Sequence, residues 1–336
     1  MTKCDGFHSV DTCRRWLAVG LAFPALALTG ALRAQAKAPV VIGWLSTGTA
    51  AAGEQGRATF NESMAALGWK LGEQYVLEAR AADGRMNLLP ALAQEIAARK
   101  SALFVAMPSS SARAAMAAAP STPVVLALGD PLATGLVSSL ARPDGMLTGL
   151  SNVSTATGQK AIELLVETLP KLQRVGFLAD LTAPTHATTV TLARRAAERF
   201  RLEAVIVDIA KPENIEPALA RLAKAKVQAL VVLPSSWFQA YMAKIIEPAL
   251  VQRWPVVGNL ERIPRHGGLF SFGADEQALI QRSAYYVDRI LKGAKPGDLP
   301  IEQPTTFKLV LNLKTAKQLG ITIPQSMLIR ATEVIE

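Results

Sequence analysis

The sequence predicts an α/β fold of two similar lobes, each built around a parallel sheet. Short apolar runs alternate with helical patterns from Val40 onward, at the spacing typical of strand–helix–strand units. The same landmarks return in the same order about 130 positions later. The chain has 336 residues, of which 50% are hydrophobic, so two ordinary domains can each bury a core.

The first lobe begins with an apolar run, Val40–Leu45, that is typical of a strand buried in a parallel sheet. A loop and a helix over 54–67 are expected to follow it. A second helical pattern covers 90–99, and strands are expected over 102–106 and 124–128. This order of elements predicts successive strand–helix units on one sheet.

Four landmarks carry the internal repeat. Each is a short motif with a counterpart at an equivalent strand or helix boundary of the second lobe. The pairs are Ile42–Leu45 with Val175–Leu178, Pro90–Ala93 with Pro217–Ala220, Pro108–Ser110 with Pro234–Ser236, and Pro123–Val125 with Pro255–Val257. A single match is weak evidence in a chain rich in alanine, but four in the same order predict two lobes of like construction.

Extended runs over 147–152 and 268–273 join the lobes, and a long helix over 275–291 follows the second run. A last strand is expected over 307–311 and a last short helix over 314–319. Several extended crossings between two lobes predict a hinge and a cleft. The predicted division is a signal peptide at 1–36, a first lobe at 37–151 plus about 274–304, and a second lobe at 152–273 plus about 305–336.

The first 36 residues have the pattern of a secretory signal peptide. Arg14-Arg15 precede a short apolar run, and Ala34-Gln35-Ala36 is a small-x-small cleavage signal. The apolar run is shorter than the ~20 residues that span a bilayer, although an uncleaved anchor stays open. Both cysteines, Cys4 and Cys13, lie in this segment, so the mature chain is expected to have no disulfide. These features predict a periplasmic protein, exported by the general or the twin-arginine route.

Charge and motif content exclude several functions. The net charge is +9, but the basic residues are scattered, which favours a solvated surface over nucleic-acid binding. Dinucleotide, phosphate-loop, hydrolase-elbow and zinc-protease motifs do not occur in the sequence. The two histidines after the leader, His186 and His266, lie in loop-like surroundings. We therefore predict no catalytic residue, metal or cofactor.

Polar residues at predicted strand ends are the candidates for a binding site. Ligands of open parallel sheets bind beyond the carboxyl ends of the strands, where helix-start N–H groups and hydroxyls can hold a carboxylate. Asp130 follows a strand and could bind an ammonium group, or it could cap a helix starting near Leu132. Ser109 and Ser235 could likewise be ordinary N-caps. Trp237 could face the cleft or pack against a helix.

Several motifs resemble one known family. They are Gly129–Pro143, Ala284–Pro296 continuing through Leu299–Thr305, Leu311–Lys317 and Ile321–Pro324. These resemble the tryptophan/tyrosine-type substrate-binding proteins of ABC importers, and the resemblance covers nearly all of the mature chain. It implies a type I periplasmic-binding fold with three crossings that closes on a small ligand, and it implies a permease and an ATPase as partners.

Carried to matching positions, the resemblance and the strand-end rule together predict one ligand-binding set. Its members are Ser46, Thr47, Ser109, Ser110, Asp130, Asn152, Asp180, Ser235 and Asp275. Asp180 and Asp275 could instead cap helices.

The sequence thus predicts a monomeric solute-binding protein that captures an amino acid or related carboxylate by hinge closure and delivers it to an ABC importer. Two alternatives stay open. One is a sensory module that presents the ligand to a membrane receptor, and the other is an exported hydrolase or isomerase that uses carboxylates in the cleft.

Overall fold

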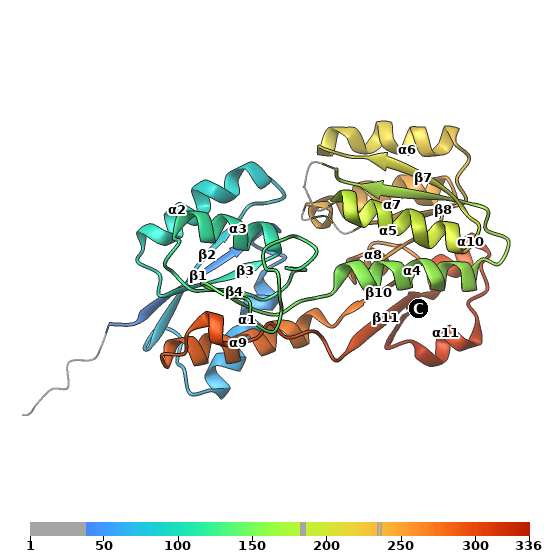
Figure 1. Ribbon diagram of the computed structural model, residues 1–336. Coiled ribbons are helices and arrows are strands. Elements are labelled where there is room, and N and C mark those ends of the chain that lie inside the picture. The colour runs from blue at the N-terminus through green and yellow to red at the C-terminus, as the bar shows by residue number, and fades with distance from the viewer. Residues whose placement is uncertain (1–37, 182–185, 234, 236) are drawn as a thin grey trace, which may run out of the picture. The chain divides into compact units, whose positions relative to one another are not determined.

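The computed structural model describes residues 38–181, 186–233, 235 and 237–336 (Figure 1). The predicted signal peptide and both cysteines lie outside the described residues, as does the side chain of His186. Residues 38–336 form one compact unit. Among the described residues, no helix is both long and apolar enough to cross a membrane.

The first sheet has five parallel strands in the order β2-β1-β3-β4-β5. Its central strands are apolar runs buried on both faces, as the sequence predicts. The strands are β1 (Val40–Ser46), β2 (Tyr75–Ala81), β3 (Leu103–Met107), β4 (Val124–Leu126) and β5 (Leu147–Gly149). The helices that pack with them are α1 (Glu54–Ala66), η1 (Met86–Leu88), α2 (Leu89–Ala98), α3 (Ser109–Ala118) and α9 (Glu276–Leu291).

The second sheet has seven strands in the order β12-β11-β10-β9-β8-β6-β7. They are β6 (Arg174–Ala179), β7 (Glu203–Asp208), β8 (Ala229–Val232), β9 (Val256–Gly258), β10 (Phe270–Ala274), β11 (Phe307–Asn312) and β12 (Glu333–Ile335). The remaining helices are α4 (Ser154–Thr168), α5 (His186–Arg199), η2 (Pro212–Asn214), α6 (Ile215–Lys224), η3 (Phe238–Tyr241), α7 (Met242–Val251), α8 (Arg262–Arg265), η4 (Pro296–Asp298), α10 (Leu313–Leu319) and α11 (Gln325–Arg330).

The strand orders confirm the internal repeat. In the second sheet the strands β7-β6-β8-β9-β10 follow the same order as β2-β1-β3-β4-β5 in the first. Two apolar clusters pack against each sheet, one on either face, so each lobe has its own core. Trp44 is fully buried in one of these cores, where its ring centroid lies 5.3 Å from that of Phe60.

The second sheet is built mainly from parallel pairs, as predicted, with one antiparallel exception. Strand β11 runs antiparallel to its neighbour β10, beside which it lies in Figure 1. The reason is the path of the chain. Strand β10 leaves the second sheet for helix α9, whose apolar side chains pack into the core of the first lobe, and β11 returns from there into the same sheet.

The helix expected near Leu132 is also absent from the described structure, which has a turn there. The backbone N–H of Thr134 donates to the carbonyl of Asp130 at 2.9 Å, and that single turn ends at Gly135. Gly135 has φ +63°, a left-handed conformation that does not continue a helix.

Three segments cross between the lobes, at 150–153, 274–275 and 302–306, and backbone hydrogen bonds tie them together. The N–H of Ser151 donates to the carbonyl of Glu302 at 2.8 Å, and the N–H of Asp275 donates to that of Thr306 at 3.2 Å. The exact lobe boundaries given above stay a prediction.

Candidate functional site

A cavity of about 660 Å³ lies beyond the carboxyl ends of strands β1 and β3. The first lobe contributes the β1–α1 segment, the end of β3 and the start of α9. The second lobe contributes helix α8 and the start of β11. The lining residues are Ser46, Thr47, Gly48, Thr49, Ala51, Ala52, Gly53, Gln55, Gly56, Met107, Pro108, Leu128, Asn152, Glu261, Arg262, Arg265, Glu276, Gln277, Ile280 and Lys308.

Three of the predicted site residues line this cavity: Ser46, Thr47 and Asn152. Backbone hydrogen bonds hold the segment that carries the first two. The carbonyl of Ser46 accepts from Ala82 N–H at 2.9 Å, and the N–H of Thr47 donates to the carbonyl of Met107 at 3.2 Å. The polar groups at the end of β1 are therefore fixed by the neighbouring strand ends.

Asp130 and Ser109 lie together, but neither is among the lining residues of the cavity. The hydroxyl of Ser109 accepts from the backbone N–H of Asp130 at 3.2 Å, so Ser109 is not the N-cap of α3. One carboxylate oxygen of Asp130 accepts from the N–H of Thr155 at 3.2 Å and from the hydroxyl of Ser154 at 3.4 Å. The other oxygen accepts from the N–H of Ala133 at 3.3 Å, so Asp130 caps both the turn near Leu132 and the start of helix α4. Ser110 is half-buried and is likewise not among the lining residues.

The equivalent strand ends of the second lobe are occupied by a buried polar cluster. The carboxylate of Asp180 accepts from the hydroxyl of Ser235 at 3.0 Å and from the indole N–H of Trp237 at 2.9 Å. All three residues are buried. Trp237 packs edge-to-face on Phe238, with ring centroids 4.6 Å apart, so it belongs to the core of the second lobe.

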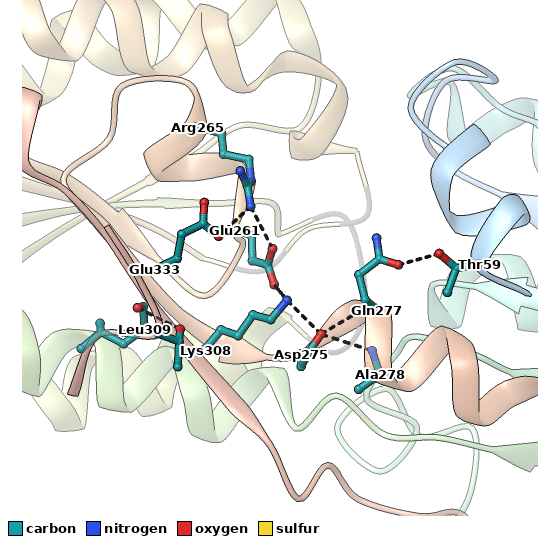
Figure 2. A network of polar contacts seen from close by, with 10 residues as sticks. Thr59, Glu261, Arg265, Asp275, Gln277, Ala278, Lys308, Leu309 and Glu333 are labelled. Carbon is teal, nitrogen blue, oxygen red and sulfur yellow. Dashed lines mark hydrogen bonds and ion pairs between the residues drawn. The ribbon is translucent and has the colours of Figure 1, made fainter. Parts of the chain in front are cut away.

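Asp275 caps helix α9, as one of its two interpretations predicts. Its carboxylate accepts from the N–H groups of Gln277 and Ala278 at 3.1 and 3.2 Å. Lys308 lies 3.0 Å from the same oxygen and 3.3 Å from an oxygen of Glu261. Figure 2 shows this network extending on one side to Arg265 and Glu333, and on the other side from Gln277 to Thr59 of α1.

The charged residues of the cavity are the ones that sequence reasoning missed: Glu261, Arg262, Arg265, Glu276 and Lys308. Most of them follow strands β9 and β10, so the same strand-end rule contained the signal. The predicted set contains hydroxyl, aspartate and asparagine side chains, and no glutamate, arginine or lysine.

The electrostatics of Glu276 are unusual. Its side chain is partly exposed to the cavity but enclosed by protein, and this burial raises the pKa of its carboxyl to about 7. The negative charge of Glu261 raises the pKa further, while Arg262 and Lys308 oppose the shift. For Lys308 burial acts to lower the pKa, but the contacts with Asp275 and Glu261 outweigh it and raise the pKa above its usual value.

A metal site finds no support in this geometry. Within the part of the chain that the structure describes, no three His, Cys, Asp or Glu side chains are grouped so that they could hold a metal ion. The charged residues of the cavity include both acids and bases. Some of them form ion pairs, and the others face the cavity.

Comparison with known proteins finds relatives of this chain and solved structures that share its fold. The chain is 23% identical over 269 residues to the tyrosine-binding protein of Clostridioides difficile (strain R20291), covering 80% of this chain and 77% of that protein. It superposes with TM-score 0.81 and 25% identity on the ABC domain from Streptococcus pneumonia in complex with L-Trp, covering 88% of this chain and all of that one.

A more distant structure has the same fold. It is a periplasmic binding protein/LacI transcriptional regulator from Alkaliphilus metalliredigens, with TM-score 0.55 and 12% identity, covering 80% of this chain and 96% of that one. The expected type I periplasmic-binding fold is thereby confirmed. The model of a family described as ABC transporter substrate binding protein matches residues 50–335. Because that match covers most of the sequence, the chain belongs to the family of ABC transporter substrate-binding proteins.

Proposed function

We propose that this protein works outside the cytoplasm, where it binds an amino acid in the cavity and delivers it to an ABC importer. The first candidate for this ligand is an aromatic amino acid. Membership of the family implies a small-molecule ligand and an ABC transporter as partner, and the family is one of binding proteins rather than enzymes. The relatives named for tyrosine and L-Trp support the choice of ligand class.

The observation that carries this proposal is the composition of the cavity wall. Elements of both lobes contribute to it, so a ligand that contacts both walls stabilises the closed arrangement by its differential affinity. A second hollow of about 570 Å³ lies against η2, α6 and α7 and is lined by the second lobe alone. A ligand bound there would contact the second lobe only, so it could not stabilise the closed arrangement of the two lobes.

The size and the chemistry of the cavity suit an amino acid. A volume of about 660 Å³ falls in the range of small-molecule sites, roughly 300–1,000 Å³. Met107, Leu128 and Ile280 supply apolar wall for a side chain, while charged and hydroxyl groups supply polar contacts. Among the predicted residues we propose Ser46, Thr47 and Asn152 as ligand contacts.

For five of the other six predicted residues, all except Ser110, we propose a supporting role. Ser109 and Asp130 join the loops at the end of the first sheet to helix α4, Asp180 and Ser235 hold each other, and Asp275 holds the start of α9. These contacts fix the elements from which the cavity is built.

The test is thermal unfolding of the purified protein against a panel of L-amino acids, their decarboxylated amines and other small carboxylates. A ligand at 100 times its dissociation constant adds about 2.7 kcal/mol, which corresponds to several degrees at this chain length. We expect the largest shift with an aromatic L-amino acid. If no amino acid shifts the transition while another class of ligand does, the proposed ligand class is wrong.

Turnover separates binding from catalysis. We expect an amino acid incubated with the protein to be recovered unchanged. A product formed in proportion to protein concentration would support the exported-enzyme alternative instead.

A further inference from the structure

The charged residues of the cavity divide into two groups, those that already have a partner and those that do not. Lys308 is paired with Asp275 and Glu261, and Arg265 lies 2.9 Å from Glu333 and 3.7 Å from Glu261. These four contacts are part of the network drawn in Figure 2. The charges of Lys308, Arg265 and Glu261 are largely neutralised within the protein, so these side chains offer little to a ligand.

The other two charged residues, Glu276 and Arg262, have no partner of this kind. Within the described part of the chain, neither side chain makes a hydrogen bond or an ion pair, although both line the cavity. Both are partly exposed, and Arg262 is near enough to Glu276 to lower its pKa. A carboxylate and a guanidinium are therefore present on the wall of one cavity with their hydrogen-bonding groups unused.

The two residues come from different lobes. Glu276 is the first residue of α9, whose apolar side chains belong to a first-lobe core. Arg262 is the first residue of α8, which follows strand β9 of the second sheet. A ligand that bound both would bridge the lobes at the side of the cavity near the crossing at 274–275.

We propose that Glu276 and Arg262 recognise the two charged ends of a free α-amino acid, Glu276 accepting from its ammonium group and Arg262 donating to its carboxylate. This inference rests on the proposed function and names the contacts that would select a zwitterion over a simple acid or amine. The planar guanidinium matches a carboxylate in two parallel hydrogen bonds, and a carboxylate is the natural acceptor for an ammonium group. The apolar wall of Met107, Leu128 and Ile280 is left for the side chain.

The environment of Glu276 is consistent with this role. A carboxylate that is enclosed and lies near Glu261 is costly to ionise without a cation, and the ammonium group of the ligand would supply that cation. The charged groups around it are Arg262 and Arg265 from α8, Glu261 directly before α8, Lys308 from β11, and Asp275 directly before Glu276 itself. The β1–α1 segment adds no charged residue to the lining.

The experiment is binding of three related probes to two variants, measured by titration calorimetry with competition for weak binders. The probes are L-tryptophan, L-tryptophanamide, which lacks the carboxylate, and indole-3-propionate, which lacks the ammonium group. If the panel selects another amino acid, its own amide and deaminated acid replace them. We expect Glu276→Gln to weaken L-tryptophan and its amide about 10- to 100-fold and to leave indole-3-propionate unchanged.

Arg262→Gln should give the opposite selectivity. It should weaken L-tryptophan and indole-3-propionate by a similar factor and leave the amide unchanged. A general loss of folding would lower affinity for all three probes alike, so the pattern across probes separates recognition from structural damage. The thermal unfolding of each variant without ligand provides a second check.

Two exposed residues provide matched controls. Glu54 is the first residue of helix α1, as Glu276 is of α9, so Glu54→Gln makes the same change at the same helix position outside the cavity lining. Arg289→Gln removes one exposed arginine from α9. Both should bind L-tryptophan as the parent does.

The pH dependence gives a further readout. With the pKa of Glu276 near 7, about one tenth of the carboxyl is ionised at pH 6 and about nine tenths at pH 8. Affinity for L-tryptophan should therefore rise about tenfold between these pH values in the parent, and this rise should be absent in Glu276→Gln.

The outcomes separate the two proposals. If an amino acid binds but both variants bind it as tightly as the parent, the proposed function stands and the assignment of Glu276 and Arg262 is wrong. If no amino acid binds at all, the proposed ligand class and this inference both fail.

Discussion

The carboxyl ends of the two sheets differ, although the sheets repeat one topology. At the end of the first sheet, Ser46 and Thr47 line the cavity. At the equivalent position of the second sheet, Asp180 accepts from Ser235 and Trp237 and the three form a buried cluster. The repeat thus preserves strand order and core packing, while the polar chemistry of the strand ends has diverged.

The difference shows where the charged contacts of the cavity come from. They lie on or next to α8, α9 and β11, close to the segments that cross between the lobes. They do not lie at the strand ends that the repeat places at matching positions. The sensory alternative uses the same cavity, and only the identity of the membrane partner separates it from transport.

The largest expected effect tests the topology that the two sheets share. The fifth repeated strand carries a glycine at its end in the first lobe, Gly149, and one residue before its end in the second, Gly273. A Cβ there would lie 2.2 Å from the carbonyl oxygen of Leu126 or 2.1 Å from that of Asn259. Gly149 also has φ +126°, which other residues rarely adopt. We expect Gly149→Ala to lower the free energy of unfolding by roughly 3 kcal/mol or more, measured by urea denaturation.

Gly158→Ala is the matched control. Gly158 lies within helix α4, and a Cβ there meets nothing within 4 Å. That substitution should be neutral or should stabilise the protein by about 0.5–1 kcal/mol. Equal effects at Gly149 and Gly158 would contradict the close strand approach on which the shared topology depends.

The second-largest effect concerns Glu276, which follows the crossing at 274–275 and lies outside the internal repeat. The pKa of Glu276 is raised from 4.5 to about 7 in the folded protein, first by burial and then by Glu261. The folded state therefore binds this proton more tightly than the unfolded state, so the contribution of Glu276 to stability falls as pH rises from about 4.5 to about 7. The loss amounts to at most about 3 kcal/mol at pH 8.

Glu276→Gln removes that loss. Its free energy of unfolding should exceed that of the parent by an amount that grows between pH 5 and pH 8, as measured by urea denaturation without ligand. Glu54→Gln serves as the control for a first-turn glutamate outside the cavity lining. A gain in Glu276→Gln no greater than in this control would mean that Glu276 is not buried as the structure has it.

The smallest effect tests the buried cluster of the second lobe. Asp180→Ala removes the acceptor of Ser235 and Trp237, so the free energy of unfolding should fall by about 2 kcal/mol. In a double-mutant cycle with Trp237→Phe, which keeps an aromatic ring but loses the indole N–H, the two losses should not add. Affinity for the amino acid should stay within about threefold of the parent. A large loss of affinity with little loss of stability would make Asp180 a ligand contact instead.

Much of the fold was accessible from the sequence because it depends on local pattern. The apolar run at Val40–Leu45 and the helical pattern near 54–67 are the observed β1 and α1, to within a residue or so. The four repeated motifs predicted two lobes of like construction, and the equivalent strand orders of the two sheets confirm it. The family motifs of the tail pointed to the family whose model matches residues 50–335.

The partners of the polar residues were not accessible, because hydrogen bonds between distant segments leave no local pattern. Asp130 was expected near its own turn, and its carboxylate also holds the start of α4, more than twenty residues further on. Lys308 reaches Asp275 and Glu261 only because β11 returns antiparallel to β10. The same long-range packing leaves Glu276 and Arg262 on the cavity wall without a hydrogen bond or ion pair to any residue that the structure describes.

The alternation of strands and helices, the repeat and the family can be read from the sequence, since strand and helix propensities and recurring motifs are properties of neighbouring residues. Long-range packing sets which polar groups neutralise one another and which stay open to a ligand. That choice depends on distances between segments far apart in the chain, and on the burial that shifts the pKa of Glu276.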